Sequence, residues 1–225
     1  MSVDTVIFDL DGVIIDSEEE WNAVRHRVAE AHGGHWNPMT DQAFLMGDNS
    51  MQWAARMREV NGVRLSDKEI YDAIVGGLRE RYARRLPLIA GVREVIAGLA
   101  AEYRLGVASS SPLELIEYVL DLSELRGHFH AVVSSDEVER GKPEPFVYLE
   151  ACARLGSRPE HSVAVEDSTS GIQAAHAAGL AVIAVPNPEF PPSADAVALA
   201  DVVLGSIVRL DRAVVASLRR ETVGD

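Results

Sequence analysis

Residues 3–13 read Val-Asp-Thr-Val-Ile-Phe-Asp-Leu-Asp-Gly-Val, and this stretch decides the fold. The apolar run that ends at Phe8 predicts a buried strand, and Asp9 and Asp11 follow it directly. Because side chains alternate along extended backbone, these two carboxylates are expected to point the same way, and Gly12 allows a sharp turn beneath a ligand. The alternative is an ordinary turn after a strand, since Asp and Gly are common turn residues.

Four further apolar segments are short and mostly rich in Val or Ile. They predict strands at residues 104–108, 131–134, 162–166 and 181–185. Helical patterns separate the later segments, so strand and helix alternate along the chain. This order predicts an α/β fold with a doubly wound, mainly parallel, Rossmann-like sheet.

Local signals mark where some of these helices begin and end. Ser111-Pro112-Leu113-Glu114 predicts an N-cap, a proline at the first helical position and a capping box, with the helix running to about Asp121. Gly156 and Gly179 stand where helices at 146–155 and 171–178 need a left-handed residue at their carboxyl ends.

One connection is much longer than a crossover requires, because nearly a hundred residues separate the first two predicted strands. Helical spacing over 18–32, and capping-box pairs Asn49 with Gln52 and Ser66 with Glu69, predict helices in this connection. We therefore expect an inserted small all-helical cap domain at residues 17–86, and an α/β core domain formed by residues 1–16 and 87–225.

Composition narrows the class of protein further. The 225 residues are 47% hydrophobic and 25% charged, with a net charge of −14, which argues against nucleic acid or an anionic membrane as a partner. No apolar run reaches the roughly 20 residues that a membrane span needs, and the first residues enter a strand without a basic leader. We expect a cytoplasmic protein that is a monomer or a weak homodimer.

Polar side chains follow the carboxyl ends of the predicted strands, where ligands bind in a doubly wound sheet. They are Asp9, Asp11, the serines 109–111, Lys142, Glu166 and Asp167. Several carboxylates at one point repel each other unless a cation neutralises them, and hard oxygen ligands suit Mg²⁺. Hydroxyl, amide and ammonium donors beside that cation are the groups that bind a phosphate.

With these residues in place, the chain resembles the haloacid dehalogenase superfamily, in the branch with a helical cap after the first strand. Four motifs match in order: Asp9 to Val13, Ser109, Gly141-Lys142-Pro143, and Glu166-Asp167-Ser168 with Gly171-Ile172. The sequences around the first and fourth motifs are similar to those of sugar-phosphate phosphatases and the β-phosphoglucomutase group. The resemblance implies Mg²⁺-dependent hydrolysis of a small phosphorylated metabolite, such as a sugar or polyol phosphate.

The resemblance also assigns roles to residues. Asp9 is implied to be the nucleophile that forms an aspartyl-phosphate, and Asp11 the general acid and base. Ser109, the Ser110 amide and Lys142 are implied to bind the phosphoryl group. Mg²⁺ is implied to be held by Asp9, the Asp11 carbonyl and Asp167, with Glu166 binding directly or through water. The cap loop Gly47-Asp48-Asn49-Ser50 is implied to touch the substrate.

Some positions distinguish members of the superfamily. Dehalogenases lack the second aspartate, so Asp11 favours a phosphatase. The mutases carry a histidine near Asp11 and an arginine in the cap loop, whereas this chain has Trp21 and Ser50 there. These departures favour hydrolysis over a β-phosphoglucomutase-like mutase. A non-catalytic metabolite-binding regulator is the alternative of another class, against which the intact acidic residues argue.

Overall fold

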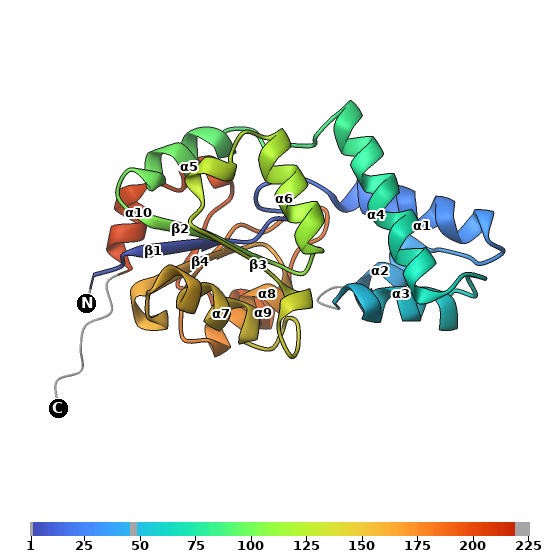
Figure 1. The fold of residues 1–225 in the computed structure, drawn as a ribbon. Coiled ribbons are helices and arrows are strands. Elements are labelled where there is room, and N and C mark those ends of the chain that lie inside the picture. Colours follow the sequence, from blue (N-terminus) through green and yellow to red (C-terminus); the bar gives the residue numbers. More distant parts are fainter. Residues whose placement is uncertain (1, 46–48, 219–225) are drawn as a thin grey trace.

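The computed structural model describes residues 2–45 and 49–218, and these residues form a parallel sheet with an inserted group of helices (Figure 1). The described sheet is six-stranded, in the order β3-β2-β1-β4-β5-β6, and every neighbouring pair is parallel. The strands are β1 (Thr5–Phe8), β2 (Arg104–Ser109), β3 (Ala131–Ser134), β4 (Ser162–Glu166), β5 (Ala181–Ala184) and β6 (Val202–Val203). The predicted α/β fold class is confirmed.

Helices cover both faces of the sheet, as a parallel sheet requires. One apolar cluster joins one face to α5 (Val92–Ala100), α6 (Leu113–Leu122) and α10 (Arg212–Ser217). A second cluster joins the other face to α7 (Phe146–Leu155), α8 (Thr169–Ala177) and α9 (Ala194–Val197). These helices leave the carboxyl ends of the strands free for contacts with the inserted segment after β1.

The long connection after β1 contains helices, as expected. They are α1 (Glu18–Ala31), α2 (Pro38–Leu45), α3 (Ser50–Glu59) and α4 (Asp67–Arg84), here called the cap, and they lie at one end of the sheet (Figure 1). Both predicted capping boxes are present, with Asn49 capping α3 and Ser66 capping α4. The two chain crossings lie side by side, because Asp16 donates its amide to the Pro87 carbonyl at 2.8 Å.

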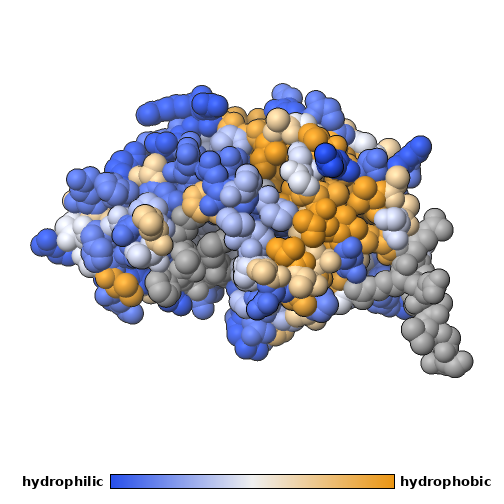
Figure 2. Space-filling view, turned by 180° about the vertical axis from the view of Figure 1, so that it is seen from behind, coloured by the Kyte–Doolittle hydropathy of each residue, from blue (hydrophilic) through white to orange (hydrophobic). Residues whose placement is uncertain are grey.

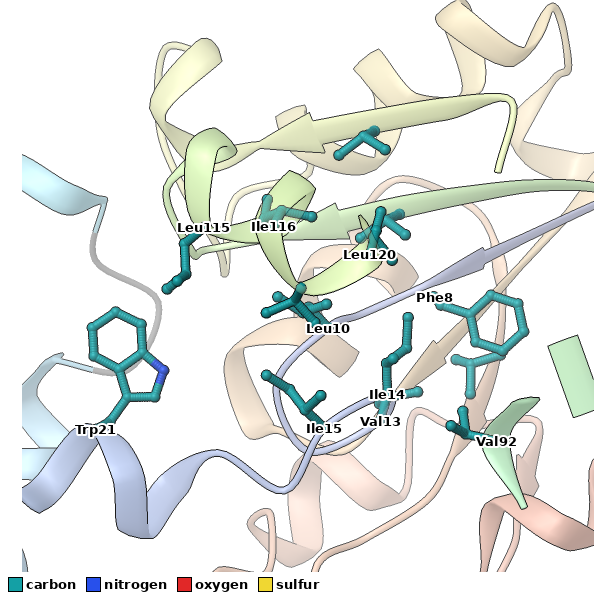
Figure 3. Close-up of a cluster of buried hydrophobic side chains, with 14 of the residues drawn as sticks. Phe8, Leu10, Val13, Ile14, Ile15, Trp21, Val92, Leu115, Ile116 and Leu120 are labelled. Atoms are coloured by element: carbon teal, nitrogen blue, oxygen red, sulfur yellow. The ribbon is translucent and has the colours of Figure 1, made fainter. Parts of the chain in front are cut away.

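The apolar core continues from the sheet into the cap. Figure 3 shows Phe8 on β1 and Leu10, Ile14 and Ile15 in the loop after it, with Trp21 of α1 on the cap side of the same cluster. Seen from the opposite face, the cap surface is mainly polar, whereas an apolar area extends over the core (Figure 2). None of the described helices is both long and apolar enough to cross a membrane.

Candidate active site

Lys142 is the centre of a buried ion cluster at the carboxyl ends of the strands. Its ammonium donates to Asp9 Oδ1 at 2.6 Å, to Glu166 Oε1 at 2.6 Å and to the Ala108 carbonyl at 3.1 Å. All three donors of the ammonium are thus satisfied. Burial alone would lower the pKa of Lys142, but the charges of Asp9 and Glu166 raise it above its ordinary value, so the ammonium stays protonated.

Three buried carboxylates lie together at this site, and two of them, Asp9 and Glu166, contact Lys142. Asp9, Glu166 and Asp167 bring ligand oxygens within 4.8 Å of one another. Burial, the largest cause, raises the pKa of Asp9 to about 8, although Lys142 opposes the shift. Burial and the charge of Glu166 also raise the pKa of Asp167 well above its ordinary value. One ammonium does not balance three carboxylates, so these residues fit a divalent cation.

Glu166 is held by donors on both of its oxygens. Oε1 accepts from Lys142 and from the Tyr148 hydroxyl at 2.8 Å. Oε2 accepts the Asp167 amide at 3.0 Å and both the amide and hydroxyl of Ser168 at 3.2 and 3.0 Å. Because the protein itself occupies these oxygens, Glu166 serves to orient Lys142 and the loop after β4.

Two glycines make room for the carboxylates. A Cβ atom at Gly12, where φ is +79°, would lie 1.9 Å from Asp167 Oδ2. A Cβ atom at Gly171 would lie 1.7 Å from Glu166 Oε1. Side chains at these positions would displace Asp167 and Glu166, which explains why glycine occupies both positions.

Asp11 is half-buried and faces both the cap and the core. Its Oδ1 accepts the Ser17 hydroxyl at 2.5 Å and the Trp21 indole at 3.1 Å. Its Oδ2 accepts the Ser111 hydroxyl at 2.6 Å and lies 3.5 Å from the Ser109 hydroxyl. Groups from two segments, the start of α1 and the end of β2, therefore fix the orientation of this carboxylate.

The predicted capping role of Ser111 is wrong. Helix α6 begins at Leu113, Pro112 occupies the flanking position, and the helix start has no side-chain cap. The Ser111 hydroxyl instead donates to Asp11, and its amide donates to Ser109 Oγ at 3.0 Å. The Ser111 hydroxyl therefore contributes to the orientation of Asp11 and not to the start of α6.

The cap loop meets the core at the start of α3. Ser50 donates its amide to Asp136 Oδ1 at 2.7 Å and its hydroxyl to Asp136 Oδ2 at 2.5 Å. Asn49 caps α3 through Gln52. Gly47 and Asp48, the other two residues of the predicted substrate loop, lie outside the described residues. The described half of the loop is thus anchored to the segment after β3.

The structure brings most of the predicted site residues together, since Asp9, Asp11, Ser109, Lys142, Glu166 and Asp167 share one mouth of the sheet. The Ser110 hydroxyl is buried there without a hydrogen-bond partner in the described part of the chain. Sequence analysis placed Ser111 with the polar residues after β2 but missed Ser17 and Tyr148. Nothing in the sequence distinguished Tyr148 from other buried residues of α7.

Without a cation, the raised pKa of Asp9 should make the stability of the protein depend on pH. The pKa of Asp9 is about 8 in the metal-free folded protein and 3.8 in the unfolded chain. Between these two pH values, Asp9 is protonated in the folded state and ionised in the unfolded state. The metal-free protein should therefore lose stability as pH rises through this window. A divalent cation competes with that proton, so its stabilising effect should grow with pH. Melting temperatures with Mg²⁺ and with a chelator, compared from about pH 5 to about pH 8, measure this. A constant difference would contradict it.

Comparison with known proteins identifies the family. The model for haloacid dehalogenase-like hydrolases matches residues 6–185. The chain belongs to this family. Hexitol phosphatase B of Escherichia coli is 38% identical over 210 residues, covering 91% of this chain and 92% of that protein. A phosphorylated carbohydrates phosphatase of Thermotoga maritima is 31% identical over 182 residues. The match covers 79% of this chain and 82% of that protein.

Solved structures of the family agree with this assignment. The crystal structure of CbbY from Rhodobacter sphaeroides in complex with phosphate superposes with a TM-score of 0.85 at 26% identity, covering 96% of this chain and 99% of that one. The chain is therefore an enzyme of the haloacid dehalogenase family whose curated relatives include sugar and hexitol phosphatases.

Proposed function

We propose that the protein is a Mg²⁺-dependent phosphatase that hydrolyses a small sugar or polyol phosphate through an aspartyl-phosphate on Asp9. The observation that carries this proposal is the placement of Asp9. Its carboxylate lies against the Lys142 ammonium at 2.6 Å, at the mouth of the sheet and beside Glu166 and Asp167. The relatives that are phosphatases of sugars and hexitols support the substrate class.

Asp9 is the nucleophile in this proposal. Attack by its free oxygen on phosphorus displaces the alcohol and forms a mixed anhydride, and water then hydrolyses that anhydride. Lys142, the Ser109 hydroxyl and the Ser110 amide bind the phosphoryl oxygens and stabilise the negative charge in the transition state.

Asp9 and Asp167 would hold Mg²⁺ together with the Asp11 carbonyl. Glu166 would bind through water, because both of its oxygens already accept hydrogen bonds from the protein. When bound, the cation offsets the charge of the carboxylates and of the substrate phosphate.

Asp11 transfers protons in both steps. As an acid it protonates the leaving alcohol oxygen, and as a base it takes a proton from the attacking water. Trp21 can only donate through its indole and cannot exchange a proton with Asp11, unlike the histidine of the mutases. This supports hydrolysis over mutation. Ser50, bonded to Asp136, likewise offers no cation for a second phosphate.

Ser111→Ala should separate substrates by their leaving group. Loss of the Ser111 hydroxyl frees Asp11 Oδ2 and should lower kcat/KM for an alkyl phosphate about tenfold. An aryl phosphate releases a more stable phenolate and depends less on protonation, so its kcat/KM should fall less. Steady-state kinetics on both substrates measure the difference. Equal losses would indicate that Ser111 has only a structural role.

A phosphate-release screen tests the proposed function. Wild-type protein with Mg²⁺ should release phosphate from sugar and polyol monophosphates and from a generic aryl phosphate, and a chelator should stop the release. A hexose 1-phosphate supplied with a bisphosphate primer should give free phosphate rather than an isomer. Isomerised product would favour the mutase, and binding across the panel without turnover would favour the regulator.

A further inference from the structure

The cap contacts the core at points that follow three adjacent strands. After β1, the Trp21 indole of α1 donates to Asp11 at 3.1 Å. After β2, α4 contacts Glu114 in the first turn of α6, and after β3, α3 contacts Asp136. Because β3, β2 and β1 are neighbours in the sheet, these contacts hold the cap along the carboxyl ends of three strands. We call this arrangement the docked cap.

Asp136 binds the start of α3 with both carboxylate oxygens. The Ser50 amide donates to Oδ1 at 2.7 Å, and the Ser50 hydroxyl donates to Oδ2 at 2.5 Å. Ser50 is the first residue of α3, so its amide has no acceptor within the helix, and a negative charge is favoured at this end. Ser50 is only 2% exposed, whereas Asp136 is exposed. Substitution of Asp136 should therefore remove the contact and leave the fold intact.

Glu114 binds α4 in the same way. The Tyr71 hydroxyl donates to Oε1 at 2.8 Å, and the Arg79 guanidinium donates to Oε2 at 3.3 Å. The Tyr118 hydroxyl adds a donor to the Arg79 carbonyl at 3.4 Å. The Glu114 side chain is 49% exposed. Both carboxylates thus hold cap helices from the surface of the core, and neither belongs to the buried acidic cluster around Lys142.

These contacts act before a substrate arrives. They join protein groups alone, so they stabilise the docked cap whether or not the site is filled. A protein that populates its binding-competent arrangement only in part binds its ligand more weakly by that fraction. Loss of either contact would leave the substrate to supply the free energy that docks the cap. Substrate binding would then weaken while the chemical step stays the same.

We propose that Asp136 and Glu114 are positioning residues that keep the cap docked, so that Trp21 keeps its hydrogen bond to Asp11 and the site is formed before the substrate binds. Both residues act through the cap, and neither takes part in phosphoryl transfer. The effect on kinetics rests on the proposed phosphatase function, whereas the effect on docking does not.

Quenching of tryptophan fluorescence by acrylamide tests docking without a substrate. The three tryptophans of the chain lie between residues 21 and 53, within the inserted segment, and each is at most 7% exposed. Undocking removes the core from the Trp21 indole, so Glu114→Ala combined with Asp136→Ala should give a quenching constant about twofold larger than wild type. Adding Trp21→Phe to both the wild type and the combined variant should abolish this difference.

Steady-state kinetics on a polyol phosphate test the effect on binding. Asp136→Ala and Glu114→Ala should each raise KM about fivefold, while kcat stays within about twofold of wild type. Glu139→Ala and Asp121→Ala are the matched controls, because each removes an exposed carboxylate, from the loop that follows Asp136 and from α6 respectively. Both controls should keep KM within about twofold of wild type.

The outcomes separate the two proposals. A wild-type quenching constant or a wild-type KM in the combined variant would overturn the positioning role. A fall in kcat with KM unchanged would also overturn it, because that result indicates an effect on the chemical step. No turnover by the wild type would overturn the phosphatase function, and the quenching comparison would still decide whether the two carboxylates dock the cap. Circular dichroism checks that the variants are folded, and if one single variant is not, the other decides.

Discussion

Asp9→Asn should abolish phosphate release, with a loss of at least about 10⁴-fold in kcat. The amide keeps the shape of the carboxylate but is a poor nucleophile, so the anhydride cannot form. The substitution also removes the negative charge that pairs with Lys142 and one carboxylate of the candidate metal site. Steady-state phosphate release from a polyol phosphate and from an aryl phosphate measures the loss.

A control that removes the same charge elsewhere separates the loss of the nucleophile from the loss of one negative charge. Asp121→Asn changes an exposed aspartate on α6 and should retain wild-type turnover. Circular dichroism should show that Asp9→Asn is folded. Turnover by folded Asp9→Asn within tenfold of wild type would show that another group attacks the phosphate.

Lys142→Met should have the largest effect on stability. The ammonium is buried between Asp9 and Glu166, and its removal leaves these carboxylates uncompensated. Breaking a buried ion pair from one side costs about 3–5 kcal/mol, so the free energy of unfolding should fall by that amount in the metal-free protein. Because Lys142 also binds the phosphoryl group in our proposal, kcat/KM should fall at least about 10²-fold.

Lys68→Met is the matched control for this substitution. Lys68 pairs with Asp72 on α4, where the two side chains are 77% and 55% exposed. A solvated pair contributes little, so the free energy of unfolding should change by less than about 0.5 kcal/mol. Denaturant unfolding in the presence of a chelator compares the two variants with wild type. Equal midpoints for Lys142→Met and wild type would contradict the role assigned to the buried ammonium.

The sheet could be predicted from the sequence because most of its strands are short, buried apolar runs. The predicted bounds 131–134 and 162–166 agree with β3 and β4. Strand β6 was missed, since Val202–Val203 is too short for a periodic signal. The acidic residues were also predictable, because the carboxyl ends of parallel strands meet at one edge whatever the details of packing.

Contacts between the cap and the core could not be predicted from the sequence. Ser50 and Asp136 are 86 residues apart, and only the packed structure brings them together. Ser111 shows the same limit, because its local sequence is typical of a helix cap, whereas its hydroxyl donates to Asp11, which lies 100 residues away in sequence. Local patterns reveal which faces are buried, but not which polar atoms meet there.

The central claim is that the reaction proceeds through a phosphoryl group on Asp9. Rapid acid quench during turnover of a polyol phosphate, followed by peptide mass spectrometry, tests it most directly. We expect a transient phosphorylated peptide that contains Asp9, with the modification mapped to that residue and absent from Asp9→Asn. Phosphate release from wild type with the label on another residue, or with no phosphorylated peptide at any quench time, would contradict the claim.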